Sequence, residues 1–354
     1  FQNQIQAASH TTPESIDLLQ YLSSFQKQGC DSVVMEVSSH ALHRHRVDGL
    51  EFNGAVFTNL SPEHLDYHLE MNDYFQAKAI LFREHLLKSQ KSNRFAILNI
   101  DDEYATKLVS DLASVQIFSF SLRSTQADLY PFNYHLNLEG VQTEIQTPWG
   151  VISLKSRLLG AFNLSNLLAA IAVGGALGIS LPLIKKALEE FSFVPGRLEK
   201  IENKKGIHVF VDYAHTPDAL RHVLSSLKNL KTPESRLITV FGCGGDRDRG
   251  KRPLMGNEVA RGSDFAWVTS DNPRTEDPQK IIQDILPGIK AQKLDAEKSI
   301  HLQIDRRLAI QEALQFARPG DVVLIAGKGH EDYQMIGKEK IHFDDREIAR
   351  SFLA

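Results

Sequence analysis

"RFAILNIDDEYATKLVSDLASVQIFSFS" (94–121) decides the fold class. Two runs rich in β-branched and aromatic residues, at 94–100 and 115–121, flank a segment at 101–113 that has the apolar period of a helix. Strands that are separated by a helix need crossover connections, which join parallel neighbours. The stretch therefore predicts an α/β protein with a mostly parallel sheet.

The same alternation extends in both directions along the first half of the chain. We expect helices at 15–29, from about 71 to 89, and at 163–178, and strands at "DSVVMEV" (31–37) and "GAVFTNL" (54–60). Residues 126–158 alternate in a β-prone pattern around the turn Pro148-Trp149-Gly150, which predicts an antiparallel appendage.

A second α/β series begins after Pro195-Gly196 interrupts the pattern. Its strands are expected at 207–213, 236–242, 265–270 and 321–327, with helices between them. We place the domain boundary near Ser192, giving domains at 1–191 and 192–354.

Composition narrows the possible partners. The chain has 354 residues, 42% hydrophobic content and a net charge of −4, with acids and bases interspersed, so neither a nucleic-acid partner nor membrane insertion is expected. Only Cys30 and Cys243 are present, which suits a reducing cytoplasm. The first residues, "FQNQIQAASHTTPES", have no initiator Met and no secretory pattern, so we expect that an upstream part is absent from this chain.

Polar clusters follow several of the predicted strands, where ligands of α/β sheets bind. In "EVSSHALHRHR" (36–46), Glu36 can hold a metal or orient water, Ser38 can bond a ligand, and Arg44 and Arg46 can neutralise an anion. A helix start capped by serine is the alternative for this stretch.

"FTNLSPEHLDYH" (57–68) brings His64, Asp66 and His68 to the end of a strand, where they can bind a divalent ion or form a solvated loop. Lys78 lies among apolar residues of a helix. Such a lysine normally extends its ammonium to water, but near a metal it can lose its proton and react with carbon dioxide to become a carbamate ligand.

"VFGCGGDRDRGKRPLMG" (240–256) almost fits the phosphate-binding loop pattern. Arg252 replaces the Ser or Thr that would meet magnesium, and Asp246 and Asp248 would repel phosphate, so we reject that assignment. Arg247 and Arg249 on this Gly-rich turn suit a carboxylate better.

Two further turns follow strands of the second series. "TSDNPRTEDP" (269–278) holds Asp271, Asn272, Pro273 and Arg274, and "AGKGHEDYQ" (326–334) holds a Gly-rich turn. Ordinary strand-to-helix turns are the alternative for both. The residues of interest in the second turn are Gly327, Lys328, His330 and Glu331.

Taken together, these stretches resemble the Mur ligase family over essentially the whole chain. The strings that carry the resemblance are "EVSSHAL" (36–42), "FTNLSPEHLDYH" (57–68), "LLGAFNLSNLLAA" (158–170), "PGRLE" (195–199), "VDYAHTPDAL" (211–220), "GCGGDRDRGKRPLM" (242–255), "DNPR" (271–274) and "GKGHE" (327–331). The resemblance implies a central ATPase-type domain with a mostly parallel sheet, followed by a Rossmann-like C-terminal α/β domain.

The resemblance also implies a reaction. Members of the family use ATP to phosphorylate a peptide carboxylate, and an incoming amine then attacks the acyl phosphate. Glu36 would be a Mg²⁺ ligand for the nucleotide, while His64 and carbamylated Lys78 would hold a second Mg²⁺. Within the family the motifs are similar to those of the member that adds meso-2,6-diaminopimelate to UDP-N-acetylmuramoyl-L-alanyl-D-glutamate. That reaction belongs to peptidoglycan precursor synthesis. The resemblance also implies a monomer.

The resemblance assigns three groups of binding residues. The UDP-muramoyl dipeptide would contact Thr11, Thr12, Ser38, Arg44 and Arg46. The adenosine part of ATP would contact Asn163, Asn166, Arg197, Asp212 and His215. Diaminopimelate would contact Arg247, Asp271, Asn272, Pro273, Arg274, Gly327 and Glu331, with Arg274 on the distal carboxylate, Asp271 and Asn272 accepting from the distal ammonium, and Pro273 stiffening the turn.

Two departures from the family pattern stand out. The Gly-rich phosphate loop ending in Gly-Lys-Thr would lie upstream of Phe1, so residues 1–354 alone are expected to be inactive. His10 and Arg44 stand where relatives often carry Asn or Gln, which leaves the dipeptide contacts open. A lysine-adding relative, a folylpolyglutamate synthetase-like ligase and a non-catalytic binding fragment are the alternatives, and Arg274 separates the first two from the diaminopimelate enzyme.

Overall fold

The computed structural model describes residues 8, 10–61, 65–291 and 299–354, without the side chains of Leu65 and Asp66. These residues form two compact units. Unit 1 is Phe1–Tyr134, Thr143–Leu154 and Leu164–Leu188, and unit 2 is His135–Gln142, Lys155–Asn163 and Glu189–Ala354. The division is not a single cut in the chain, and the domain boundary between residues 191 and 192 stays a prediction.

Unit 1 is built on a parallel sheet of order β1-β2-β3, from β1 (Gly54–Phe57), β2 (Phe95–Asn99) and β3 (Gln116–Phe120), as predicted. The expected long helix is α4 (Met71–Ile80), continued by a π-helical segment η1 (Leu81–Leu86). These helices and α5 (Glu103–Val109), which ends in the 3₁₀ turn η2 (Ser110–Leu112), bury their apolar side chains with those of the sheet. The remaining helices before β2 are α1 (Ser15–Lys27), α2 (Ser39–His43) and α3 (Leu65–His68).

The strand predicted at 31–37 does not form. Residues 30–38 have no regular secondary structure, and Val33 and Val34 are 47% and 94% exposed. A β-prone run becomes a strand only where a neighbour completes its hydrogen bonds. Here the segment is held instead by Thr12, whose hydroxyl donates to the carbonyl of Glu36 and accepts from the amide of Ser38, both at 3.0 Å.

The appendage at 126–158 is a three-stranded sheet of order β4-β5-β6, from β4 (Tyr130–Asn137), β5 (Gly140–Thr147) and β6 (Gly150–Ser156). Two-residue connections join these neighbours, and only antiparallel strands can be linked so tightly. The expected appendage is therefore confirmed, and α6 (Gly160–Ala176) and α7 (Leu181–Glu190) follow it.

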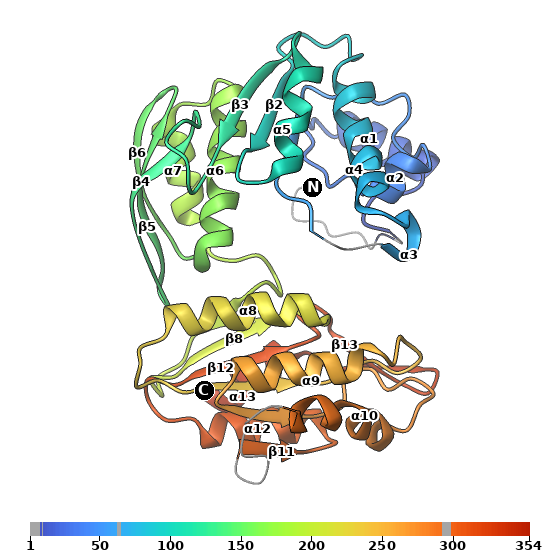
Figure 1. The fold of residues 1–354 in the computed structure, drawn as a ribbon, viewed down its shortest axis with the longest axis vertical. Coiled ribbons are helices and arrows are strands. Elements are labelled where there is room, and N and C mark those ends of the chain that lie inside the picture. The colour runs from blue at the N-terminus through green and yellow to red at the C-terminus, as the bar shows by residue number, and fades with distance from the viewer. Residues whose placement is uncertain (1–7, 9, 62–64, 292–298) are drawn as a thin grey trace. The chain divides into compact units, whose positions relative to one another are not determined.

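Unit 2 contains a six-stranded sheet of order β11-β10-β9-β12-β8-β7. Figure 1 shows its strands β8 and β12 beside helices of the same unit. All neighbours are parallel except the antiparallel edge pair β7–β8. The four predicted strands are confirmed as β8 (His208–Asp212), β9 (Leu237–Phe241), β10 (Phe265–Val268) and β12 (Val322–Ala326). Two short edge strands, β7 (Glu199–Ile201) and β11 (Ile300–Leu302), were not predicted from the sequence.

Helices cover both faces of this sheet. Alternate strand residues point to opposite faces, so Phe210 joins the core under one set of helices and Val209 the core under the other. The first set is α8 (Pro217–Leu230), α9 (Lys251–Gly262) and α10 (Pro278–Lys290), and the second is α12 (Arg306–Phe316) and α13 (Asp345–Leu353). This double covering is the doubly wound arrangement expected of a Rossmann-like domain.

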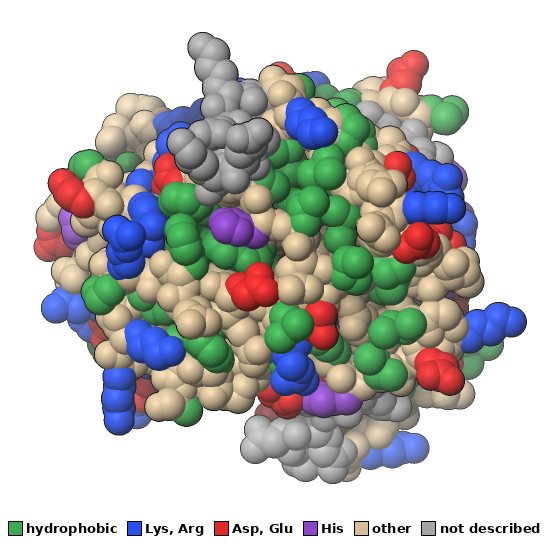
Figure 2. All heavy atoms as spheres, turned by 90° about the horizontal axis from the view of Figure 1, so that it is seen from below, with side chains coloured by type: hydrophobic (Ala, Val, Ile, Leu, Met, Phe, Trp, Pro, Cys, Tyr) green, Lys and Arg blue, Asp and Glu red, His purple; other side chains and the backbone are tan. Residues whose placement is uncertain are grey.

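A small antiparallel hairpin, β13 (Tyr333–Ile336) and β14 (Glu339–His342), follows β12 and was not predicted. Among the described residues no helix combines the length and the apolar character needed to cross a membrane. The face drawn in Figure 2 carries basic and acidic side chains intermixed, without a broad field of either sign among the described residues.

The packing of α9 against α10 depends on two glycines. A Cβ on Gly256 would lie 2.5 Å from the carbonyl oxygen of Ile285, and one on Gly288 would lie 1.7 Å from that of Pro253. Both distances are far inside van der Waals contact with backbone that cannot rotate away. We expect Gly288→Ala to lower the free energy of unfolding of unit 2 by about 2 kcal/mol or more, measured by urea denaturation.

The matched control is Gln283→Ala on the exposed face of α10. Its effect on unfolding should stay within about 0.5 kcal/mol. Equal stability of the two variants would contradict the close helix contact.

Candidate functional site

Three loops meet at the carboxyl edge of the unit 2 sheet. They follow β9, β10 and β12, which are adjacent and parallel, so the predicted residues after each strand are brought together. The amide of Gly245 donates to the carbonyl of Asn272 at 2.9 Å, and a Cβ on Gly327 would lie 2.7 Å from Oδ2 of Asp271. We call this set the acceptor pocket; it consists of Arg247, Asp271, Asn272, Pro273, Arg274, Gly327 and Glu331.

The turn that carries Arg274 is pinned to β13. The amide of Arg274 donates to the carbonyl of Met335 at 3.0 Å, and its own carbonyl accepts from Gly337 at 2.7 Å. Arg274 has φ 51°, a left-handed conformation that a non-glycine residue adopts at some cost. The β13–β14 hairpin, which was not predicted from the sequence, therefore fixes the position of this turn.

Asn272 lies at the centre of a buried polar cluster. Its Oδ1 accepts from Nζ of Lys328 at 3.0 Å and from the amide of Met335 at 2.9 Å, while its Nδ2 donates to Oε2 of Glu331 at 3.0 Å. Both lone pairs of the amide oxygen are thus occupied. This arrangement leaves one N–H of the amide, and not its oxygen, to face a ligand, which differs from the predicted role of Asn272 as an acceptor from an ammonium.

Arg274 and Arg247 flank the Gly-rich loop after β9. Nη1 of Arg274 donates to the carbonyl of Gly245 at 2.8 Å. A Cβ on Gly244 would lie 3.1 Å from Nη1 of Arg274 and 3.6 Å from Cγ of Arg247, so the absence of a side chain there leaves room for both arginines. Arg247 is exposed and Arg274 is half-buried, which leaves two guanidinium groups able to meet one anion.

Glu276 ties this loop to the turn at 271–277. Its carboxylate takes a bidentate pair from buried Arg252 at 2.7 and 3.0 Å, an ion pair from Arg249 at 3.0 Å, and the amide of Asp246 at 2.6 Å. The hydrogen bond to Arg252 lowers the pKa of Glu276 to about 2. Burial of the side chain, which is 13% exposed, would by itself raise this pKa. Arg252 also pairs with Asp284 at 2.8 Å, so it braces the loop instead of meeting a phosphate, in line with the rejected phosphate-loop assignment.

The residues assigned to adenosine lie mostly in unit 2. Arg197 lies over the ring of Tyr213 at 5.4 Å, and that ring contacts His215 at 4.5 Å and His330 at 5.2 Å between centroids. Asp212 accepts from the amides of Leu198 and Ala214, both at 2.8 Å, and burial raises its pKa above the usual range despite these bonds. Asp212 therefore shapes the loop, while exposed Arg197 and His215 and half-buried Tyr213 can face a ligand.

Asn163 and Asn166 lie at the start of α6, in unit 2 and unit 1 respectively. Asn163 is buried and its Nδ2 donates to the carbonyl of Leu159 at 2.9 Å, whereas Asn166 is exposed. Their assignment to the nucleotide stays a prediction.

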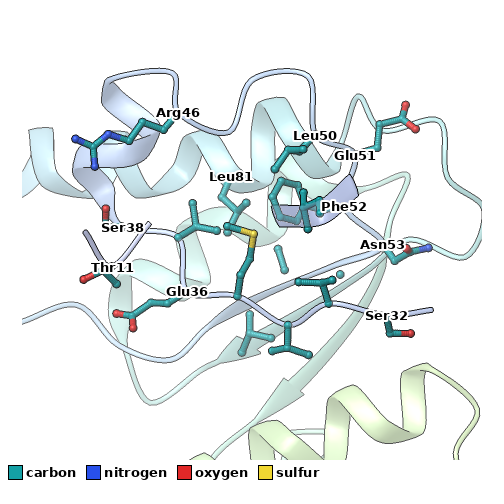
Figure 3. Close-up of a pocket in the computed structure, with 18 of the residues that line it drawn as sticks. Thr11, Ser32, Glu36, Ser38, Arg46, Leu50, Glu51, Phe52, Asn53 and Leu81 are labelled. Carbon is teal, nitrogen blue, oxygen red and sulfur yellow. The ribbon is translucent and has the colours of Figure 1, made fainter. Parts of the chain in front are cut away.

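Unit 1 contains a pocket of about 1850 Å³. Its lining includes six residues singled out from the sequence: Thr11, Glu36, Ser38, Arg44, Arg46 and Lys78. Figure 3 shows Thr11, Glu36 and Ser38 close together at one end, with Leu50, Phe52 and Leu81 forming an apolar part. The pocket thus has a polar end that suits a charged ligand or metal and an apolar part beside it.

Several predicted residues of unit 1 also have structural roles. Ser38 caps α2 by accepting from the amide of Ala41 at 3.2 Å, which confirms the capping alternative for its side chain. Arg46 is buried, donates to the carbonyl of Thr12 at 3.1 Å and pairs with Glu14 at 2.6 Å. Thr12 is fully buried, so Thr11 is the threonine of this pair that lines the pocket.

The metal-binding assignment of His64, Asp66, His68 and Lys78 stays a prediction. His64 and the side chain of Asp66 lie outside the described residues, and His68 is buried with its Nε2 2.9 Å from Oγ of Ser39. Lys78 is half-buried with Nζ 5.0 Å from the ring centre of Tyr74. Within the described part of the chain no group of three or more His, Cys, Asp or Glu side chains could hold a metal ion.

Comparison with known proteins gives a consistent result. The model of the Mur ligase middle domain matches residues 1–174, and that of the Mur ligase glutamate ligase domain matches residues 196–329. A UDP-N-acetylmuramoyl-L-alanyl-D-glutamate–2,6-diaminopimelate ligase from Geobacter metallireducens is 50% identical over 361 residues, covering 98% of this chain and 69% of the relative. The protein of the same name from Nostoc sp. is 49% identical over 350 residues, covering 98% and 68%.

A solved structure of a ligase with this name superposes with a TM-score of 0.70 at 37% sequence identity. The match covers 98% of this chain and 69% of that chain. The α/β fold predicted from the sequence, with its mostly parallel sheets, is thereby confirmed.

The bracing role of Glu276 predicts a pH-dependent stability. Its folded pKa lies below the unfolded value near 4.5, so its stabilisation is fully present above about pH 4.5 and is lost as the pH falls through about 2. We expect Glu276→Gln to lower the free energy of unfolding at pH 7 by about 1 to 3 kcal/mol, with the difference from wild type shrinking by more than half at pH 3. Urea denaturation across this pH range measures it.

Glu234→Gln, in an exposed loop of the same unit, is the control and should change stability little at any of these pH values. A difference for Glu276→Gln that did not depend on pH would contradict the ion-pair explanation.

Proposed function

Because this chain belongs to the Mur ligase family, we propose that the protein joins meso-2,6-diaminopimelate to UDP-N-acetylmuramoyl-L-alanyl-D-glutamate in an ATP-dependent reaction of peptidoglycan precursor synthesis. The relatives that carry this substrate in their names match almost the whole chain at about 50% identity. The observation that carries the proposal within the structure is the acceptor pocket, where Arg274 and Arg247 flank Gly244 while Asp271 and Glu331 lie across the same group of loops.

This charge arrangement fits the distal end of diaminopimelate. That end is an α-amino acid centre, with a carboxylate and an ammonium on one carbon. Two guanidinium groups can hold the carboxylate and the two acids can accept from the ammonium. Lysine has the same length but no distal carboxylate, so it would leave Arg274 without its partner, and buried groups left unpaired are a strong source of discrimination.

The chemistry consists of two transfers. The γ-phosphoryl group of ATP passes to the D-glutamyl carboxylate, giving an acyl phosphate and ADP. The neutral amine of the acceptor then attacks the acyl carbon, and the resulting tetrahedral intermediate expels inorganic phosphate to form the amide. Residues of unit 2 would orient the amino acid, and Thr11, Ser38, Arg44 and Arg46 of unit 1 would bind the UDP-muramoyl dipeptide; His10 lies beside them in the pocket lining.

Magnesium would be held at the polar end of the unit 1 pocket. Glu36 supplies carboxylate oxygens there, which suit Mg²⁺, and phosphate oxygens of the nucleotide commonly complete its ligands. Lys78 would become a ligand only as a carbamate, and His64 is assigned by resemblance alone. Bound Mg²⁺ would neutralise the charge that develops on the transferred phosphoryl group.

The adenosine part of ATP would be bound by Arg197, Tyr213 and His215, with Asn163 and Asn166 on α6. Tyr213 is an addition to the residues found from the sequence, because its ring contacts the predicted Arg197 and His215. We also place the protein in the cytoplasm, since ATP and a UDP-linked substrate are cytoplasmic metabolites. We further propose that it acts as a monomer. Neither a nucleic acid nor a membrane-inserted segment is part of this function.

The acceptor specificity is tested by an amino-acid addition assay on the full-length gene product. Wild type should use meso-diaminopimelate and discriminate strongly against lysine. Arg274→Ala should lower kcat/KM for diaminopimelate by about 30-fold or more, corresponding to roughly 2 kcal/mol or more for a truncated charge pair. Arg261→Ala, an exposed arginine at the end of α9, is the control and should leave kcat/KM unchanged. Equal use of lysine by wild type would defeat the assignment.

Lys78 gives a second test. If its carbamate is a metal ligand, Lys78→Ala should abolish turnover, and formate or acetate at about millimolar concentration should restore part of it by supplying the missing carboxylate. Phosphate release measured with and without these anions provides the readout. Unchanged turnover in Lys78→Ala would remove Lys78 from the mechanism.

A further inference from the structure

Lys328 is a buried cation that the reaction described above does not use. Its side chain has no exposed surface, and its Nζ donates to the carbonyl of Tyr333 at 2.7 Å and to Oδ1 of Asn272 at 3.0 Å. Two carboxylates lie slightly further away, Asp271 at 3.5 Å and Glu331 at 3.6 Å. These four oxygen atoms belong to the acceptor pocket or to the adjoining β13.

We propose that Lys328 is a positioning residue that sets the polarity of the acceptor pocket without touching the ligand. It holds the amide of Asn272 so that an N–H group, and not the oxygen, faces the substrate, and it neutralises one of the two carboxylates beside it. This inference rests on the proposed function and adds to it a residue that controls how diaminopimelate is recognised.

The orientation of the Asn272 amide follows from its partners. A lysine ammonium and a backbone N–H can only donate hydrogen bonds, so the atom that faces both Lys328 and Met335 must be the oxygen. The NH₂ group is then turned toward Glu331, which takes one of its two hydrogens. The second hydrogen is left for the ligand, and a carboxylate oxygen is the group that would accept it.

The charges of the cluster also favour a ligand that carries both an ammonium and a carboxylate. Asp271 and Glu331 carry two negative charges, and Lys328 supplies one positive charge against them. Arg306 is nearby, with Nη2 3.9 Å from a Cβ built on Gly327, but it is already paired with Asp345 at 2.7 and 2.9 Å. One negative charge is left over to attract an ammonium, while Arg274 and the Asn272 amide donate to a carboxylate.

Removal of Lys328 would disturb both parts of this pattern. The amide of Asn272 would lose one of the two donors that fix its orientation, and the two carboxylates would lose the cation beside them. Lys328→Met keeps most of the side-chain length. In the full-length gene product we expect it to raise KM for diaminopimelate by about 30-fold or more, as for truncation of a buried charge pair, with KM for ATP and for the UDP-linked substrate changed less than about 3-fold.

Arg236→Met separates positioning from stability. Arg236 makes a bidentate pair with buried Asp321 before β9 and β12 begin, at the opposite edge of the same sheet. Both Arg236→Met and Lys328→Met should lower the melting temperature. Arg236→Met should leave KM for diaminopimelate unchanged. A rise in this KM that was equal in the two variants, or no rise in Lys328→Met, would overturn the inference.

Asn272→Asp tests the polarity directly and does not depend on whether Lys328→Met folds. The replacement has the same shape and keeps an acceptor for Lys328 and Met335, but it has no N–H to offer a carboxylate. We expect KM for diaminopimelate to rise about 10-fold or more. An unchanged or lower KM would show that Asn272 acts through its oxygen and would defeat the inference. If wild type failed to use diaminopimelate at all, the proposed function would fall instead.

Discussion

The parallel alignment of β9, β10 and β12 is the constraint on which the acceptor pocket depends. Side chains of these strands are buried on both faces, so a strand cannot slip without moving apolar residues out of the core. The fixed register sets where each strand ends, and three loops emerge side by side at one edge. Asn272 can then join residues that are distant in sequence, since it is hydrogen-bonded to Gly245 at 2.9 Å and to Glu331 at 3.0 Å.

A buried cation is hydrogen-bonded to each of these loops and holds it in place. Arg252 braces the loop after β9, Lys328 holds Asn272 after β10, and Arg306 donates to the carbonyl of Ala326 at the end of β12 at 3.0 Å. Such ion pairs add little net stability, because removing the charges from water costs about as much as their attraction returns. Their value here is geometric, since each one fixes the orientation of a loop that must present donors and acceptors to a ligand.

In unit 1 the candidate ligand-binding residues line a pocket. Its pocket combines a polar end around Glu36 with an apolar part formed by Leu50, Phe52 and Leu81. The backbone beside Glu36 is held by the buried hydroxyl of Thr12 and not by a sheet. A segment fixed by side-chain bonds leaves the Glu36 carboxylate directed into the pocket, where a metal ion and phosphate groups could reach it.

Much of the fold and of the candidate site could be predicted from local pattern. Helix and strand periods identified both α/β series, and Arg274, Asp271 and Glu331 were found because parallel strands bring the residues after them to one edge. The strand at 31–37 failed because its β-prone residues lack a partner for their hydrogen bonds. The edge strands β7 and β11 and the β13–β14 hairpin were too short for their periodicity to stand out.

The sequence by itself therefore determined the α/β class, the family and the residues that gather at the acceptor pocket. Only the tertiary structure decided the direction of the Asn272 amide, the burial of Lys328 and Arg306, and the pinning of Arg274 by β13. The physical reason is that the polarity of a hydrogen-bonding group depends on its partners, and the partners of Asn272 lie 56 to 63 residues away along the chain.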